Sequence, residues 1–296
     1  MTISPSSRQE FEPYTAENGI LRPLLPVSHR EGEYDSAEFD SLRAMQQDHF
    51  WYRGRHRFLL RALRNELLCC GRDGQSGRAV DLGGGCGGWV RYLADRQPDA
   101  FAELALADSS LHALEYAREI VPPDTPRYQC DLLQLGWTDR WDVAFLLDVL
   151  EHIPDDAAAL RSIRQSLAPG GLLFVTTPAL RCFWTWNDEA AHHQRRYSKA
   201  DFRRLADQTG FKLLDARYFI FFLSPLMMAV RWMARLRHGL RQPTPAELKA
   251  LVQHTHSIPA RPINEVLAAL CAAETPLGHY MSFPWGTSIL VVLKRD

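Results

Sequence analysis

The amino-acid sequence predicts an α/β fold built around a mostly parallel sheet. Short apolar runs alternate with amphipathic runs between residues 78 and 210, and the buried strands of a parallel sheet have this near-continuous apolar character. A glycine-rich turn, GGGCGG, joins the first apolar run to the first amphipathic one. The chain has 296 residues, of which 46% are hydrophobic and 23% charged, and this composition is ordinary for a globular protein.

The first residues of the chain are expected to lie outside the sheet. Residues 1–40 are rich in Ser, Pro, Glu and Gly and are predicted to run over the surface. Helical spacing of apolar residues begins near Asp40 and resumes from Arg55 to Leu68. These helices are expected to form a cap.

The sheet itself is expected between residue 78 and the end of the chain. The runs predicted as strands are Arg78–Leu82, Ala102–Ala107, Arg127–Cys130, Asp142–Leu147, Leu172–Thr176, Phe211–Tyr218 and Ser288–Leu293. The runs predicted as helices are Gly88–Arg96, Leu111–Glu119, Asp156–Leu167 and Lys199–Thr209. We therefore expect an N-terminal extension with cap helices over residues 1–78 and one main domain over 79–296, with an insert at 220–285.

The glycine-rich turn ends a strand and opens a helix, the place where an α/β sheet receives a nucleotide-like ligand. Gly83, Gly85 and Gly88 have the spacing of a dinucleotide-binding loop. Taken alone, this spacing is weak evidence. Asp81, two residues before the first glycine, disfavours a diphosphate there and suits a positively charged sulfonium amino acid.

Acidic residues also follow the next three predicted strands. Asp108 ends LALAD, Asp131 ends RYQCD, and Asp148 lies in FLLDVLEHI. A carboxylate at the position of Asp108 can accept hydrogen bonds from both hydroxyls of a ribose. A nicotinamide enzyme has no evident use for carboxylates at four successive strand ends.

Together these motifs resemble class I S-adenosylmethionine-dependent methyltransferases. The resemblance rests on VDLGGGCG, LALAD, QCDL, LLDVLEHI and LAPGG before FVTTP, in that order. HFWYRGRHRFLL, HHQRRYSKADFRRLADQTGF and FFLSPLMMAVRW extend it to a broad bacterial group of small-molecule and envelope-associated methyltransferases. The chain departs from the common pattern at Gly84 and Cys86, where Cys and Thr are usual. The resemblance implies a Rossmann-like seven-stranded sheet with an antiparallel last strand, a helical N-terminal cap and a helical insert between the last two strands.

The resemblance also implies S-adenosylmethionine as cofactor and a set of residues that hold it. They are Asp81, Gly83, Gly85, Gly87 and Asp148 at the methionine portion, Asp108 and Ser109 at the ribose, and Asp131 and Leu132 at the adenine. Two of them have a simpler interpretation, because Asp81 and Asp148 could serve only to cap or order loops.

Aromatic residues of the N-terminal cap are expected to cover the cofactor. Trp51 and Tyr52 are predicted to pack over it, with an arginine such as Arg57 near its carboxylate. Such a lid would exclude water, a competing nucleophile. The alternative is that these aromatics belong to the core and that the surrounding arginines form a solvated face.

Methyl transfer from a sulfonium needs alignment and, for some acceptors, removal of a proton. His152, in DVLEHI, and His193, in HHQRRYS, lie near the expected mouth of the site and are candidate general bases. His152 could instead order the helix that follows the fourth strand.

Three residues beside His193 are candidates for the acceptor site. Arg195, Arg196 and Tyr197 could bind an anionic group of the acceptor. They could equally be solvated residues before a helix whose N-cap is Ser198.

The insert offers apolar residues, among them Phe222, that could line an acceptor pocket or simply bury the insert. A third possibility is contact with a membrane surface through residues 218–241, where arginines flank an apolar run. The run is too short to span a bilayer.

Charge and cysteine spacing bear on the partners of the protein and on its location. With 34 Lys and Arg against 35 Asp and Glu, the net charge is −1, which makes nucleic acid an unlikely partner. The six cysteines have no C-x-x-C spacing. We therefore expect them to be reduced thiols of a cytoplasmic protein, and we expect no metal site.

We therefore expect methyl transfer to an O, N or S atom of a small molecule, such as a natural-product or lipid-linked intermediate. The alternatives are a nucleic-acid methyltransferase and a catalytically silent cofactor-binding partner in a membrane-docked assembly. The sequence does not indicate an oligomeric state.

Overall fold

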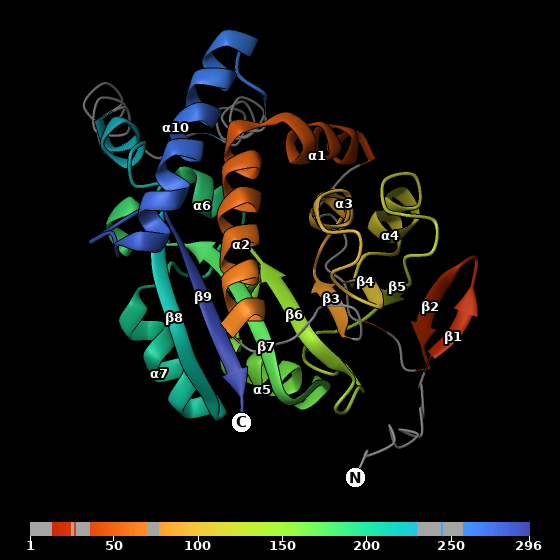
Figure 1. Ribbon diagram of the computed structural model, residues 1–296. Helices are drawn as coiled ribbons and strands as arrows, with labels where there is room; N and C mark the ends of the chain where they lie inside the picture. Colours follow the sequence, from red (N-terminus) through yellow and green to blue (C-terminus); the bar gives the residue numbers. More distant parts are fainter. Residues whose placement is uncertain (1–13, 25–26, 28–35, 70–76, 230–243, 245–256) are drawn as a thin grey trace.

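The computed structural model describes residues 14–24, 27, 36–69, 77–229, 244 and 257–296, and it contains a sheet with helices on both faces (Figure 1). Within these described residues, nine strands follow one another in the order β1-β2-β5-β4-β3-β6-β7-β9-β8. The strands are β1 (Tyr14–Glu17), β2 (Ile20–Pro23), β3 (Arg78–Leu82), β4 (Glu103–Asp108), β5 (Arg127–Gln129), β6 (Trp141–Leu147), β7 (Leu167–Pro178), β8 (Phe211–Phe219) and β9 (Ser288–Arg295). The α-helices are α1 (Ser36–Asp48), α2 (Phe50–Cys69), α3 (Gly88–Arg96), α4 (Leu111–Ala117), α5 (Asp156–Ser166), α6 (Trp186–Ala190), α7 (Lys199–Thr209) and α10 (Arg261–Tyr280), and short 3-10 helices occupy Leu150–His152 and Arg181–Phe183.

The predicted α/β fold is confirmed, including the antiparallel last strand. All seven predicted strands are present, and β9 runs antiparallel to both of its neighbours, β7 and β8. The other pairs among the seven are parallel.

The sheet is larger than predicted, because residues 14–23 add a hairpin to its edge. Strand β2 pairs in parallel with β5, at Leu21 and Tyr128. The turn of the hairpin is Asn18-Gly19, with φ of 52° and 75°, and this dipeptide favours tight hairpins because both residues adopt positive φ. The expectation that residues 1–40 only run over the surface was wrong for this part.

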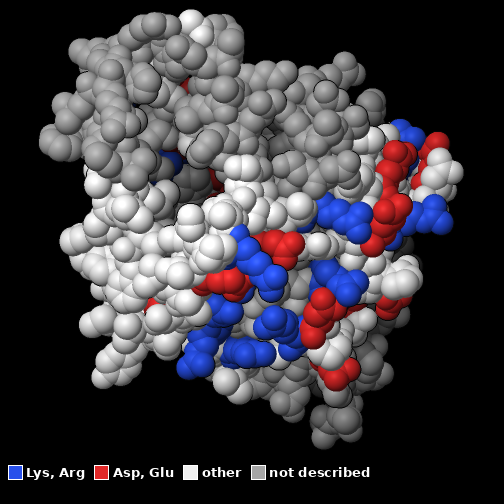
Figure 2. Space-filling view, turned by 90° about the horizontal axis from the view of Figure 1, so that it is seen from above, with Lys and Arg blue, Asp and Glu red and all other residues white. Residues whose placement is uncertain are grey.

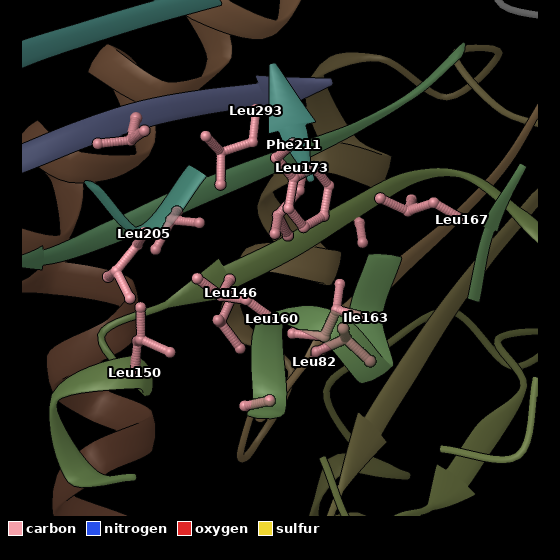
Figure 3. Packing of buried hydrophobic residues seen from close by; sticks show 14 of the residues in the cluster. Leu82, Leu146, Leu150, Leu160, Ile163, Leu167, Leu173, Leu205, Phe211 and Leu293 are labelled. Atoms are coloured by element: carbon pink, nitrogen blue, oxygen red, sulfur yellow. The ribbon is translucent and has the colours of Figure 1, made fainter. Parts of the chain in front are cut away.

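The two largest hydrophobic clusters of the described residues lie on opposite faces of the sheet. On one face, Leu160 and Ile163 of α5 and Leu205 of α7 pack against strand residues such as Leu146 and Leu173 (Figure 3). The other face carries α2 and α3. It buries Leu59 and Trp89 of these helices against Phe145 and Phe174.

Helix α2 therefore contributes to the main core. Its Leu59 and Leu63 are at most 1% exposed. On its other side it contacts α10, and the two helices approach so closely that a Cβ on Gly54 would lie 2.8 Å from Cβ of Cys271. A side chain at residue 54 would push these helices apart.

The strand order reverses between β3 and β6, which are neighbours in the middle of the sheet. From β3 the chain continues to β4 and β5 on one side, and from β6 to β7 on the other. Ligands of open α/β sheets bind at the carboxyl ends of the strands at such a reversal. The glycine-rich turn and Asp148 lie at these two strand ends.

The insert between β8 and β9 is described only in part. Helix α10 confirms that it contains a helix, whereas residues 230–241 of the proposed membrane segment 218–241 lie outside the described residues. Within the described part of the chain, no helix is long and apolar enough to cross a bilayer.

Candidate active site

The glycine-rich turn after β3 has a backbone that only glycines adopt without strain. Gly83, Gly85 and Gly87 have φ of 70°, 56° and 79°, in the left-handed region that disfavours side chains. A Cβ on Gly83 would lie 2.7 Å from a methyl carbon of Val149. This turn therefore presents bare backbone at the sheet edge, as a cradle for a ligand requires.

Asp108 organises the neighbouring rim. Its Oδ2 accepts a hydrogen bond from the backbone N–H of Gly85 at 2.8 Å, and its Oδ1 accepts one from Ser110 at 2.9 Å. The carboxylate is half-buried, and it fixes the end of β4 against the glycine turn. This is the position predicted for the ribose-binding residue.

Asp81 lies beneath the turn and is 1% exposed. Its Oδ1 has no hydrogen-bond partner within the described part of the chain. Burial raises the pKa of Asp81 to about 7, although the charge of Arg55 opposes the shift. A buried acceptor without a partner, below a bare-backbone turn, suits a ligand that brings positive charge.

The residues predicted for the adenine lie on the same rim. The backbone N–H of Cys130 donates to the carbonyl of Asp108 at 2.9 Å, which joins the end of β5 to that of β4. Oδ1 of Asp131 accepts from the backbone N–H of Leu133 at 2.9 Å and orders the following loop. The carbonyl of Ser109 accepts from Gln129 at 3.1 Å, and Leu132 is half-buried.

Helix α2 brings aromatic residues and an arginine to the end of β6. Arg55 forms an ion pair with Asp148, and the rings of Trp51 and Tyr52 lie 5.1 and 4.9 Å from its guanidinium carbon. Burial raises the pKa of Tyr52 to about 12. The two predicted aromatics thus lie beside Asp148, at the edge of the glycine turn.

Arg57, predicted to bind the cofactor carboxylate, faces elsewhere. It lines a surface depression with Arg61, Tyr92 and Arg96. Residues 55 and 57 lie roughly 200° apart around a helix, so only one of them can face the sheet edge. That residue is Arg55, which the sequence analysis did not single out.

The two predicted histidines lie next to each other. The ring centroids of His152 and His193 are 4.8 Å apart, and Nδ1 of His193 lies 3.0 Å from Oδ1 of Asp188 in α6. Burial alone would raise the pKa of Asp188, but hydrogen bonds from His193 and Arg196 and the charge of Arg196 hold it well below its usual range. A negatively charged Asp188 therefore orients the imidazole of His193.

Glu151 completes this cluster, and sequence analysis did not identify it. It is 1% exposed, and neither of its carboxyl oxygens has a hydrogen-bond partner among the described residues. Burial, and then the charge of Asp148, raises its pKa well above the usual range. Glu151, His152 and His193 offer ligand atoms that all lie within 4.8 Å of one another, so they could hold a metal ion.

Comparison with known proteins shows the family. A family described as "Methyltransferase domain" matches residues 50–216, more than half of the chain. The chain is an S-adenosylmethionine-dependent methyltransferase. The matched range includes α2, the glycine turn and the histidine cluster, so the resemblance stated from the motifs is confirmed.

Curated relatives of this methyltransferase are called "Ubiquinone biosynthesis O-methyltransferase". The one from Idiomarina loihiensis is 29% identical over 171 residues, which cover 50% of this chain and 68% of the relative. The one from Pseudomonas aeruginosa is 32% identical over 112 residues, which cover 36% of this chain and 47% of the relative. The chain thus matches only about half the length of the second relative.

Solved structures agree in fold. Phosphoethanolamine N-methyltransferase 2 from Haemonchus contortus, in complex with S-adenosylmethionine, has a TM-score of 0.56 at 14% identity, covering 90% of this chain and 58% of that one. Magnesium protoporphyrin IX methyltransferase from Synechocystis, with bound S-adenosylhomocysteine, has a TM-score of 0.52 at 16% identity, covering 88% and 95%. The cofactor is S-adenosylmethionine, as predicted.

The residues that follow His193 in this methyltransferase already have partners within the protein. Arg195 binds Oδ2 of Asp156 and the carbonyl of Pro154, each at 2.7 Å. Arg196 donates from Nε to Asp188 at 2.7 Å. Tyr197 is 2% exposed, and its hydroxyl lies 2.9 Å from Asp156. Because Tyr197 is buried, the prediction that it contacts the acceptor is wrong. Arg195 and Arg196 position the loop that carries His193.

Phe222 lies in an aromatic cluster after β8. Its ring centroid is 5.9 Å from that of Phe221 and 6.0 Å from that of Phe283. The side chain is 38% exposed, so it remains available to an apolar ligand.

Proposed function

We propose that this methyltransferase methylates a hydroxyl oxygen of a small molecule and that His193 removes the hydroxyl proton. The observation that carries the proposal is the contact between Asp188 and His193. With Nδ1 of His193 directed at a carboxylate, its proton lies on that nitrogen, and Nε2 is left to accept a proton from the acceptor.

The cofactor, when bound, supplies a methyl group on a positively charged sulfonium. The chain aligns the reacting atoms, holds its negative charges near the sulfonium and takes up the proton. Asp148 and Asp81 are the carboxylates at the carboxyl ends of β6 and β3, beside the glycine turn. Trp51 and Tyr52 exclude water from that side of the turn.

The histidine cluster and the cofactor turn are neighbours in the fold. Glu151 follows Asp148 by one short turn, and the carbonyl of Glu151 accepts a hydrogen bond from the backbone N–H of Gln194 at 2.7 Å. This bond holds the loop of His193 against the end of β6. An acceptor placed between His193 and the methionine end of the cofactor would have its hydroxyl near the base.

The names of the curated relatives support an oxygen acceptor, since both are O-methyltransferases. The net charge of −1 disfavours a nucleic-acid acceptor. Phosphoethanolamine N-methyltransferase shares only the fold, so it does not bear on the acceptor atom.

The test replaces His193 by Ala and follows formation of S-adenosylhomocysteine with a panel of small phenols and alcohols as acceptors. Loss of a general base lowers kcat roughly 100-fold or more, while the affinity for S-adenosylhomocysteine stays within twofold. His192→Ala is the matched control, because His192 is the exposed neighbour. Activity of His193→Ala equal to that of the unmodified enzyme contradicts the proposal.

A second arrangement of the cluster is favoured by the unpaired oxygens of Glu151. A divalent cation held by Glu151, His152 and His193 would bind the acceptor hydroxyl and favour its ionised form. Dialysis against EDTA separates the two arrangements. With His193 as the base, activity survives dialysis; with a metal, activity is lost and returns on addition of Mg²⁺ or Mn²⁺.

A further inference from the structure

Helix α10 has an outward face that carries no charge over most of its length. Between Val266 and Tyr280 the only acidic or basic side chains are those of Glu274 and His279. Glu274 is 3% exposed, and His279 is half-buried with Nε2 at 3.0 Å from the carbonyl of Phe58. The residues that remain exposed on this face are Val266, Ala269, Leu270, Ala273, Pro276, Leu277 and Tyr280.

These exposed residues form one continuous stripe. Val266, Leu270, Ala273 and Leu277 follow each other at intervals of three or four residues, so they lie on one side of the helix. Val266 is 61% exposed and Tyr280 90%. A stripe of this length on a helix surface marks an interaction site, since single exposed apolar residues are common but contiguous ones are not.

Arginines border the stripe on the side of α2. Arg57, Arg61 and Arg64 lie on one side of α2, and with Arg96 of α3 they line a depression of about 270 Å³. Thr275 and Pro276 of α10 line the same depression. The arginines and the apolar stripe are therefore adjacent.

These guanidinium groups have no carboxylate partner within the described part of the chain. Arg53, one turn before Arg57, forms an ion pair with Glu265 at 2.7 Å, whereas Arg57, Arg61 and Arg64 form none with any described residue. Arg96 contacts the ring of Tyr92 at 5.0 Å. Four cations around one depression attract an anion from outside the protein.

Figure 2 gives a view from above of the described surface. A broad area without charged side chains occupies its left side, and Lys and Arg side chains gather next to it below the centre. Uncharged and cationic surfaces thus adjoin on this side of the molecule, with Asp and Glu side chains lying among the cations.

We propose that this face, formed by the α10 stripe and the arginines Arg57, Arg61, Arg64 and Arg96, docks on an anionic lipid bilayer. Apolar side chains beside a basic border are the pattern of interfacial helices, which bury the apolar face at the acyl boundary and place the cations at the headgroup phosphates. The proposal holds whichever acceptor is methylated.

A second copy of the chain fits this face less well. In an antiparallel two-fold pairing of α10 with α10, the symmetry would place the arginine border of one copy beside that of the other. Like charges would then face each other across the interface. A bilayer with anionic headgroups presents opposite charge along the same border.

Vesicle flotation tests the proposal with the full chain. Vesicles of phosphatidylcholine containing about one-third phosphatidylglycerol are expected to bind the protein at about 0.1 M salt, and binding is expected to weaken at about 0.5 M. Leu270→Glu with Leu277→Glu, and separately Arg61→Glu with Arg64→Glu, should each lower the fraction bound at least about tenfold.

Matched controls make the same kinds of substitution at exposed residues outside the proposed docking face. Arg203→Glu with Lys212→Glu changes exposed cations of α7 and β8, and Leu24→Glu changes a leucine that is 72% exposed; both should float like the unmodified protein. Retained binding of S-adenosylhomocysteine shows that each variant is folded. The proposal is overturned if the unmodified protein does not float, floats equally on phosphatidylcholine alone, or is a dimer that Leu270→Glu with Leu277→Glu converts to a monomer without any vesicle binding.

Discussion

Arg55 of α2 forms an ion pair with Asp148, the residue that directly follows β6. Asp148 has φ of 57°, a conformation that costs a non-glycine residue roughly 1–2 kcal/mol. Its Oδ2 also accepts a hydrogen bond from Thr176 at 3.1 Å. The pair therefore fixes a strained residue at the cofactor edge and ties the helix that precedes the sheet to that edge.

Arg55→Ala is expected to destabilise the protein and to weaken cofactor binding. The side chains of Arg55 and Asp148 are 6% and 18% exposed, and removing one member of a largely buried pair costs about 3 kcal/mol. Urea unfolding measures the loss. The Arg53–Glu265 pair is a control on the same helix, because it is more exposed and Arg53→Ala should cost at most about 1 kcal/mol. Equal effects of the two substitutions would contradict a specific role for Arg55.

Asp81 is expected to make stability depend on pH. Because burial raises its pKa from 3.8 to about 7, the folded state keeps a proton that the unfolded state loses between those values, and stability falls as pH rises through this window. Asp81→Asn removes this dependence. In cofactor-free protein, the stability of the variant relative to the unmodified chain should therefore be about 3 kcal/mol more favourable at pH 8 than at pH 5. Asp99→Asn, an exposed change, serves as control. A relative stability that does not change with pH would show that Asp81 titrates normally.

Gly83→Ala is expected to weaken cofactor binding by distorting the turn. Its φ of 70° is unfavourable for alanine, and the added Cβ would lie 2.7 Å from Val149. We expect at least about tenfold weaker binding of S-adenosylhomocysteine by calorimetry. Adding Val149→Ala relieves the contact but not the strain, so the double variant should recover part of the affinity. No recovery would show that the contact with Val149 is unimportant.

Patterns that repeat along the chain could be predicted from the sequence. Apolar runs marked seven strands, and the acidic residues Asp81, Asp108, Asp131 and Asp148 marked four strand ends, because parallel strands place their carboxyl ends on one edge. The hairpin at 14–23 escaped because its strands have four residues each, although Asn18-Gly19 was a usable signal.

Features that depend on the direction of one side chain were harder to predict. Arg55 shares a helix face with the buried Leu59 and Leu63, whereas Arg57 shares one with the exposed Arg61 and Arg64. Helical periodicity could therefore have distinguished the two arginines.

No periodicity or motif in the sequence indicated the roles of Asp188 and Glu151. Their roles depend on the approach of α6 and its following loop to the end of β6. That approach is a tertiary contact, and local pattern does not encode it.

The most direct test of the proposed cofactor site is calorimetry of S-adenosylhomocysteine with Asp108→Ala. Asp108 is the carboxylate assigned to the ribose, and loss of hydrogen bonds to a charged group should weaken binding at least about 30-fold. Glu115→Ala, an exposed change on α4, should leave binding unaltered. Unchanged affinity in a folded Asp108→Ala protein would contradict the placement of the cofactor at the edge formed by β3, β4 and β6.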